Sequence, residues 1–230
     1  MQRRLAERVR VTPLRGAPRL VAGLDAAFTA ERCIAAAVLW DLRARRIVEQ
    51  RVVARPLRFP YVPGLLSFRE APALLAALRR LHDEPDVLLC DGHGLAHPRR
   101  FGIACHIGVL TGLPTVGCAK SRLVGEHVAP ARRRGARSPL EDRGEVVGSV
   151  LRTRPDAKPL FVSVGHRVDL PSALRLVLTC AREHRLAEPV HLADRLVAAS
   201  KARIADRLVA ASKARIADRL VAASKARASA

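Results

Sequence analysis

The sequence has few aromatic residues and no long hydrophobic run. Phe, Trp and Tyr make up 3% of its 230 residues, so a core must be built mainly from Leu, Val, Ala and Ile. No apolar run reaches the roughly 18 residues that a membrane span needs. The first residues also lack the apolar segment of a signal peptide. We therefore expect a cytoplasmic protein that makes no contact with a membrane.

The cysteines do not form the pattern of a disulfide framework or a zinc site. Their number is odd, their spacings are wide, and no two are separated by two residues. Each lies in an apolar stretch, which is typical of small core residues in a reducing compartment. They are Cys33, Cys90, Cys105, Cys118 and Cys180.

Acidic residues are scarce relative to basic ones. Lys and Arg number 41 against 21 Asp and Glu, which gives a formal charge of +20. Such a surplus favours a polyanionic partner, because each cation placed on a phosphate releases a condensed counterion. The alternative is a solvated Arg-rich surface, and charge alone does not indicate chemistry. The length suits one full-sized domain, which we expect to be a monomer.

Strand and helix patterns alternate along the chain, which predicts an α/β fold with a mixed central sheet. Apolar or alternating runs predict strands at residues 20–28, 33–42, 46–54, 86–90, 114–118, 148–152 and 160–164. Helical spacing of apolar residues predicts helices at 65–81, 98–110 and 170–184. Residues 129–142 are rich in Arg, Pro and Gly and are expected to form a mobile loop.

The chain ends in a repeat of twelve residues. The block at residues 193–204 recurs from Ala205 and, slightly altered, from Ala217. Twelve residues overshoot three helical turns by about 120°, so no continuous apolar stripe forms. We expect the first copy to dock on the core and the later copies to project as a basic helix. This tail could hold a duplex loosely, but we favour a neutral expansion because nothing in it looks like a site.

Two acidic residues occur where apolar strands are predicted. Asp91 follows the strand at 86–90 and precedes Gly92, His93 and Gly94, at the end of a strand where ligands collect in α/β sheets. Read alone, this segment is also compatible with an ordinary turn. Asp25 stands within the apolar strand at 20–28, where an unpaired carboxylate is costly. A metal ion held by both acids would make that placement favourable.

A stiff loop precedes the first predicted helix. The only tyrosine, Tyr61, lies between prolines, which fix the local backbone. On a basic protein such a loop could act as a wedge between stacked bases. Glu70 falls in the first turn of the following helix, where an acid is also favourable for the helix dipole alone.

These segments resemble the endonuclease V family. The resemblance is carried by residues 60–70 and 91–106, continues through 117–123, and includes 21–25 and 165–167. It runs from about residue 20 to Asp194 and implies a ribonuclease H-like fold. We therefore divide the chain into one catalytic domain, 1–194, and a basic helical tail, 195–230.

The resemblance implies roles for individual residues. The acidic metal cluster would be Asp25, Glu70 and Asp91, with Asp194 as a fourth and more variable position. His97 and Lys120 match positions near the scissile strand. The wedge would be Tyr61 shaped by Pro60, Val62 and Pro63, and the pocket for a flipped base would involve Gly92, His93, Gly94, Leu123 and Gly125. Asp206 and Asp218 share the local sequence of Asp194. Only the distance of Asp194 from Glu188 and Pro189 distinguishes it from them.

The family resemblance implies nicking of DNA at the second phosphodiester bond 3′ to deoxyinosine. Hard carboxylates favour Mg²⁺, with Mn²⁺ as a substitute, over zinc. The expected partner is damaged double- or single-stranded DNA. Inosine-containing RNA remains an alternative substrate, and a non-catalytic nucleic-acid-binding module remains an alternative function.

Overall fold

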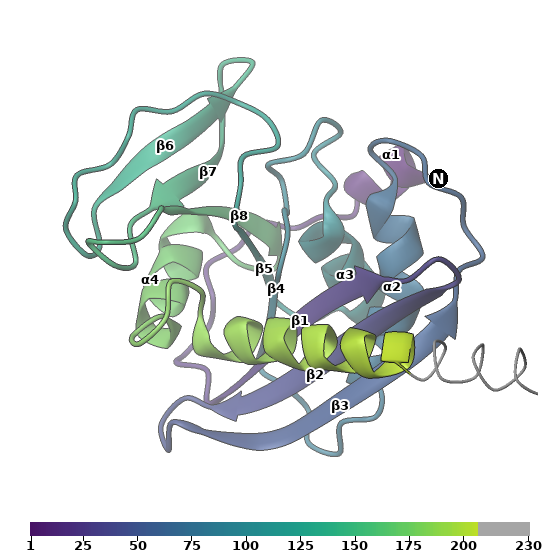
Figure 1. Ribbon diagram of the computed structural model, residues 1–230. Helices are drawn as coiled ribbons and strands as arrows, with labels where there is room; N and C mark the ends of the chain where they lie inside the picture. Colours follow the sequence, from purple (N-terminus) through teal and green to yellow (C-terminus); the bar gives the residue numbers. More distant parts are fainter. Residues whose placement is uncertain (207–230) are drawn as a thin grey trace, which may run out of the picture.

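The computed structural model describes residues 1–206, built around one eight-stranded sheet (Figure 1). The strands are β1 (Leu20–Phe28), β2 (Arg32–Asp41), β3 (Arg46–Pro56), β4 (Val87–Cys90), β5 (Thr115–Ala119), β6 (Arg137–Asp142), β7 (Glu145–Leu151) and β8 (Leu160–His166). The helices are α1 (Gln2–Ala6), α2 (Leu66–Leu78), α3 (Ile103–Thr111) and α4 (Leu170–Cys180), followed by a helix at residues 188–206.

The sheet is mixed, with strand order β3-β2-β1-β4-β5-β8-β7-β6. The first three strands form an antiparallel meander, β4 and β5 run parallel to β1, and the remaining strands are antiparallel to their neighbours. The predicted α/β, ribonuclease H-like mixed sheet with flanking helices is therefore confirmed. Because β1 and β4 are parallel, the acids near their carboxyl ends lie at the same end of the sheet.

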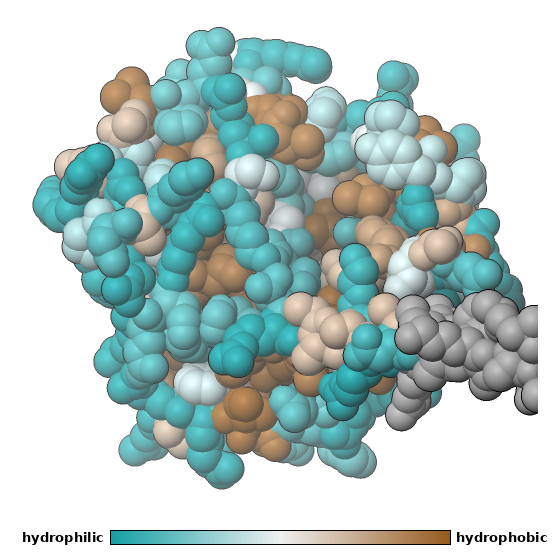
Figure 2. Space-filling model, in the orientation of Figure 1, coloured by the Kyte–Doolittle hydropathy of each residue, from teal (hydrophilic) through white to brown (hydrophobic). Residues whose placement is uncertain are grey.

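Helices cover both faces of the sheet, so its central strands are apolar on both sides. In β2, Ala35 and Ala37 belong to the cluster formed with α2 and α3, whereas Ile34, Ala36 and Val38 pack with the last helix. Successive strand residues point to opposite faces, and this alternation separates the two clusters. Figure 1 shows the last helix crossing the strands β1 and β2, and Figure 2 shows mostly hydrophilic side chains on this side of the molecule.

Several predicted elements were wrong in extent or type. The helix predicted at 65–81 ends at Leu78, and the strand predicted at 148–152 is β7, which begins at Glu145. The helix predicted at 98–110 begins only at Ile103, because the preceding residues fold back and the amide of Gly102 donates to the carbonyl of Gly94 over 3.0 Å. The helix predicted at 170–184 ends at Cys180. Part of the loop predicted at 129–142 is strand β6, which pairs with β7. The short helix α1 was not predicted.

The first copy of the repeat docks on the sheet, as expected. Ala193 and Val197 are buried against β2, and Ile204 is partly buried beside them. The helix runs unbroken through the predicted boundary between residues 194 and 195. The division into domain and tail stays a prediction, and the later copies, from residue 207, lie outside the described residues.

The cysteines occupy the interior, as expected. All five are buried free thiols, and burial raises the pKa of Cys33 and Cys105 to about 12. Within residues 1–206, no helix combines the length and the apolar character needed to cross a bilayer.

Candidate functional site

Three carboxylates from distant parts of the chain meet at one end of the sheet. One oxygen each from Asp25, Asp91 and Asp194 lie within 4.8 Å of one another. Asp25 is on β1, Asp91 follows β4, and Asp194 lies on the last helix. The parallel pairing places the first two side by side, since the amide of Asp91 donates to the carbonyl of Leu24 over 2.9 Å. Such a group of carboxylates could hold a divalent metal ion.

A close backbone contact places Asp194 over the sheet. Gly23 lies two residues before Asp25, and a side chain at Gly23 would overlap the carbonyl group of Pro189. The last helix therefore starts directly on the backbone of β1, which only glycine permits. From there, one further turn of helix brings Asp194 to the other two acids.

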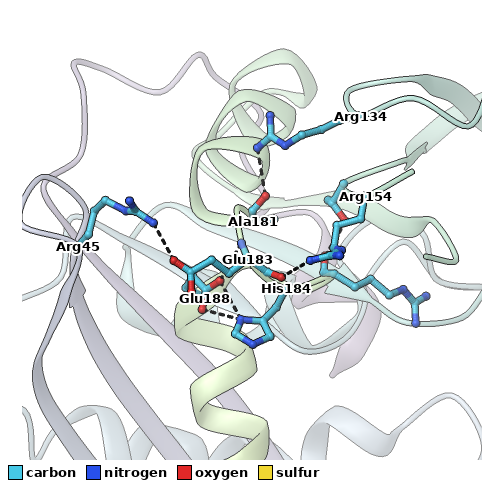
Figure 3. Close-up of polar contacts among 9 residues, drawn as sticks. Arg45, Arg134, Arg154, Ala181, Glu183, His184 and Glu188 are labelled. Carbon is cyan, nitrogen blue, oxygen red and sulfur yellow. Dashed lines mark hydrogen bonds and ion pairs between the residues drawn. The ribbon is translucent and has the colours of Figure 1, made fainter. Parts of the chain in front are cut away.

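Arginine side chains hold the loop that leads into this helix (Figure 3). Arg134 donates to the carbonyl of Ala181 over 3.1 Å, and Arg154 donates to that of Glu183 over 2.5 Å. Arg45 forms an ion pair with the Glu183 carboxylate at 3.1 Å. The first two contacts satisfy backbone carbonyls of the loop that follows the last residue of α4, Cys180. The path from α4 to Asp194 is thereby fixed.

Lys120 stands between two of the acids. Its Nζ atom lies 2.7 Å from Oδ2 of Asp91 and 2.7 Å from Oδ1 of Asp194. Burial opposes the charge of the lysine, but hydrogen bonds to Asp194 and Asp91 raise its pKa above the usual value. The ammonium group is therefore charged at neutral pH and lies within the acidic group.

The carboxylates repel one another in a partly desolvated environment. Burial and the charge of Asp91 raise the pKa of Asp25 to about 7. Burial and the charges of Asp25 and Asp91 raise the pKa of Glu70 to about 8. Glu70 is on α2, which packs on the face of the sheet opposite to the last helix. It lies outside the group formed by Asp25, Asp91 and Asp194. Acids that resist ionisation in this way are suited to bind a cation, which removes their mutual repulsion.

The predicted wedge is exposed, and residues on both sides of the loop contact it or its end. Tyr61 is 67% exposed. The Arg69 guanidinium lies 4.9 Å from the ring centroid of Phe28 and 5.9 Å from that of Tyr61, which supports the base of the loop. Gly64 ends the loop with a left-handed φ of 78°. Its backbone is hydrogen-bonded to His97. Burial and the charge of Arg99 lower the pKa of His97 to about 4.

The segment after Asp91 packs against neighbouring strands with little space for side chains. The amide of Gly94 donates to Ser163 Oγ over 2.8 Å, and a side chain at Gly94 would overlap the carbonyl of Val164. Between the glycines, burial lowers the pKa of His93 to about 4. Its Nδ1 atom is buried and has no hydrogen-bond partner among the described residues.

Two predicted pocket residues lie on the loop that follows β5. Leu123 is 52% exposed. Gly125 has a left-handed φ of 77° and lines a separate hollow with residues of β6 and of the turn between β6 and β7. Gly125 therefore faces the β6–β7 hairpin.

Sequence reasoning missed two residues that support the site. The Arg185 guanidinium donates to the carbonyl of Lys120 over 2.6 Å and opposes the rise in the Asp91 pKa. The side chain of Gln2 is buried and donates to the carbonyl of Gly64 over 2.9 Å. Both contacts join residues more than 60 positions apart, so no local pattern could have indicated them.

Comparison with known proteins identifies the family. The family model for Endonuclease V matches residues 3–195. The chain belongs to the Endonuclease V family. Endonuclease V of Geotalea uraniireducens (strain Rf4) is 52% identical over 203 residues, which cover 88% of this chain and 86% of that protein. The predicted resemblance is therefore confirmed, and the chain belongs to a family of nucleases.

Solved structures of Endonuclease V share the fold. That of Streptomyces avermitilis has a TM-score of 0.84 and 41% identity, covering 89% of this chain and 91% of its own. Endonuclease V of Ciona intestinalis has a TM-score of 0.76 at 24% identity, covering 88% and 95%. The Ciona protein was crystallised with a 24mer DNA containing an inosine followed by a ribo-adenosine.

Proposed function

We propose that this protein is a DNA repair endonuclease that recognises deoxyinosine and hydrolyses the second phosphodiester bond 3′ to it, using Mg²⁺ and leaving a 5′-phosphate. The observation that carries the proposal is the meeting of Asp25, Asp91 and Asp194 within 4.8 Å, with Lys120 beside them. The lesion and the position of the cut rest on the family resemblance. Free cysteines support action in the cytoplasm, and we propose that the protein acts as a monomer.

The carboxylates would hold the metal ion, which Mn²⁺ could replace. Asp25, Asp91 and Asp194 supply hard oxygen ligands. Glu70 lies near enough to Asp25 and Asp91 for their charges to raise its pKa, and a bound cation would favour its ionised form. When bound, the ion would activate water and stabilise the charge that develops on the scissile phosphate and the leaving oxygen. Lys120 contributes a positive charge at the same place, where it stabilises the developing negative charge on the phosphoryl oxygens.

The lesion would be recognised beside the metal ligands. A deaminated base pairs weakly, so flipping it out of a duplex costs less than flipping a normal base. Tyr61, with Pro60, Val62 and Pro63, would fill the space it leaves. His93 is neutral, and its hydrogen bond to the backbone of Ser121 would keep the ring proton on Nε2. Its unpaired Nδ1, which is buried and would have to be uncovered as the base enters, would then accept a hydrogen bond from N1–H of hypoxanthine, where adenine carries an acceptor. Leu123 would complete the pocket from the loop that follows β5.

The decisive experiment compares two duplexes that differ only in one base, deoxyinosine or deoxyadenosine. Incubation with Mg²⁺ should nick the inosine strand at the second bond 3′ to the lesion, and EDTA should prevent the cut. The Asp91→Ala variant should bind the inosine duplex without nicking it. Full nicking by that variant, or nicking of the adenosine duplex at an equal rate, would contradict the proposal.

Inosine in RNA is the second candidate substrate. The ribo-adenosine in the nucleic acid bound by the Ciona protein favours testing it. Matched DNA and RNA oligonucleotides, each with one inosine, separate the two substrates by their cleavage rates. The third candidate function is a non-catalytic nucleic-acid-binding module. It would be supported if titration with Mg²⁺ or Mn²⁺ detected no metal binding.

A further inference from the structure

A basic cavity lies at the end of the sheet away from the acidic residues. Its volume is about 640 Å³, within the range of ligand pockets. It is formed where the segment before β1 crosses the starts of β4 and β5 and the end of β8. Its polar and charged lining includes Arg10, Arg15, Asp86, His166 and Arg167.

The N-terminal segment and the end of β8 are locked together at this cavity. The amide of Arg10 donates to Nδ1 of His166 over 3.2 Å, and the amide of Arg167 donates to the carbonyl of Arg10 over 2.6 Å. Arg167 has a left-handed φ of 49°, a conformation that non-glycine residues adopt at a cost. The backbone that presents these side chains is thus fixed by tertiary contacts.

The cavity has an excess of positive charge. Arg10, Arg15 and Arg167 take part in none of the ion pairs formed among residues 1–206. The single lining carboxylate, Asp86, accepts through one oxygen from the backbone amides of Arg19 and Leu20, at 2.8 and 2.9 Å. This engages the acid with the backbone, and within residues 1–206 it forms no ion pair with the three guanidinium groups.

His166 adds a neutral donor to the same wall. Burial and the charges of Arg167 and Arg10 lower its pKa, so the ring is uncharged at neutral pH. Because Nδ1 accepts from the Arg10 amide, the ring proton resides on Nε2. Guanidinium groups and an N–H donor are the groups that recognise phosphate oxygens.

The cavity is separate from the metal site. Asp86 and Asp91 lie at opposite ends of β4, whose four residues span about 13 Å. Within residues 1–206, neither Arg10 nor Arg15 forms an ion pair with the acidic residues of the metal site. The proposed nuclease chemistry therefore leaves this cavity without a role.

We propose that this cavity binds a phosphate group, carried either by a second segment of nucleic acid or by a small phosphorylated molecule such as a nucleotide. Arg10, Arg15 and Arg167 bind the phosphate oxygens, with His166 as a further donor. The remaining volume accommodates the sugar or base to which the phosphate is attached.

The test uses the full chain and inorganic phosphate as the probe. Thermal unfolding is measured in metal-free buffer with phosphate or with chloride at equal ionic strength. We expect phosphate to raise the Tm of the wild-type protein more than chloride does, because a ligand that binds only the folded state stabilises it. The Arg10→Gln/Arg15→Gln variant should lose this difference. The Arg79→Gln/Arg80→Gln variant removes the same charge from exposed positions outside the cavity and should keep it.

A second arm identifies the source of the phosphate. Binding of a lesion-free oligothymidine is measured as a function of salt. Each phosphate contact to a single strand contributes about 0.7 to the magnitude of the slope of log K against log salt. If the cavity binds nucleic acid, losing two contacts should reduce that magnitude by about 1.4 more in the cavity variant than in the control. If the cavity variant loses the stabilisation by phosphate but has the same salt slope as the control, the site is assigned to a small phosphorylated molecule. The proposal is overturned if phosphate stabilises the wild type no more than chloride, or if the cavity variant keeps the full effect.

Discussion

The side chain of Gln2 joins the beginning of the chain to the end of the wedge loop. Its Nε2 donates to the carbonyls of Gly64 and Phe101 at 2.9 and 3.2 Å, and its Oε1 accepts from Arg99 at 2.9 Å. A residue on a five-residue helix thus connects the loop bearing Tyr61 to the segment bearing His97. The position of the wedge depends on this buried amide.

Replacing Gln2 with Leu should weaken lesion binding and leave the chemical step largely intact. Loss of the hydrogen bonds frees Gly64, so the Kd for an inosine duplex should rise about two- to tenfold. Fluorescence anisotropy measures the Kd, and single-turnover nicking measures the chemical step. Arg3→Gln, at the exposed neighbouring position, is the control. An unchanged Kd would show that Gln2 does not position the wedge.

Replacing Asp194 with Asn should weaken Mg²⁺ binding at least about tenfold, because it removes one charged ligand of three. Asp206→Asn is a matched control, since Asp206 is exposed and has the same flanking residues one repeat later. Calorimetric titration of both variants with Mg²⁺ makes the comparison. Equal affinities would remove Asp194 from the metal site.

Replacing Lys120 with Met should lower the single-turnover nicking rate about 10²- to 10³-fold, the usual effect of removing one charge-stabilising group. Lys120→Arg keeps the charge and should recover part of the rate. Since the lysine also neutralises Asp91 and Asp194, the Met variant should have a lower Tm in EDTA. A Met variant that nicks at the wild-type rate would rule out the electrostatic role.

Glu70 should make the metal-free protein less stable as pH rises. Its folded pKa of about 8 exceeds the ordinary 4.5, so the folded state retains a proton that the unfolded state loses. The free energy of unfolding therefore decreases as the pH rises from 4.5 to 8. Above pH 8 it stays at this lower value as far as Glu70 is concerned. Glu70→Gln should raise the Tm in EDTA at pH 8.5 and have little effect at pH 4.5.

Glu84→Gln is the control for this measurement, because Glu84 is exposed. Saturating Mg²⁺ should reduce the benefit of Glu70→Gln at pH 8.5. If the Glu70→Gln variant shows the same gain in Tm at both pH values, ionisation of Glu70 is not the cause.

The sequence was sufficient to predict the elements with a clear period. Apolar runs predicted β1 and β2, and the helical spacing after residue 65 predicted α2. The predicted helix start at Pro98 was wrong because backbone contacts within the loop between β4 and α3, such as that of the Gly102 amide with the Gly94 carbonyl, decide where α3 begins. Strand β6 has polar residues and a proline, and it forms only because β7 pairs with it.

The site was predictable one residue at a time but not as an arrangement. Asp25 and Asp91 were indicated by their positions in or after apolar strands, and the register of β1 with β4 explains their meeting. The immediate neighbours of Asp194 and Asp206 are the same, and only the distance from Glu188 and Pro189 favoured Asp194. Tertiary packing decides which copy of the repeat reaches the sheet. The partners of Gln2 and Arg185 likewise follow from long-range contacts.

The contact between Gly23 and Pro189 has a consequence for ion selectivity. It fixes the approach of the last helix to β1, and so the separation of Asp25 from Asp194, through main-chain atoms alone. Mg²⁺ binds oxygen at about 2.1 Å, and Ca²⁺ requires about 2.4 Å and more ligands. A gap held by two backbones does not widen for the larger ion, so at the proposed metal site discrimination between these cations would rest on a residue that has no side chain and touches neither.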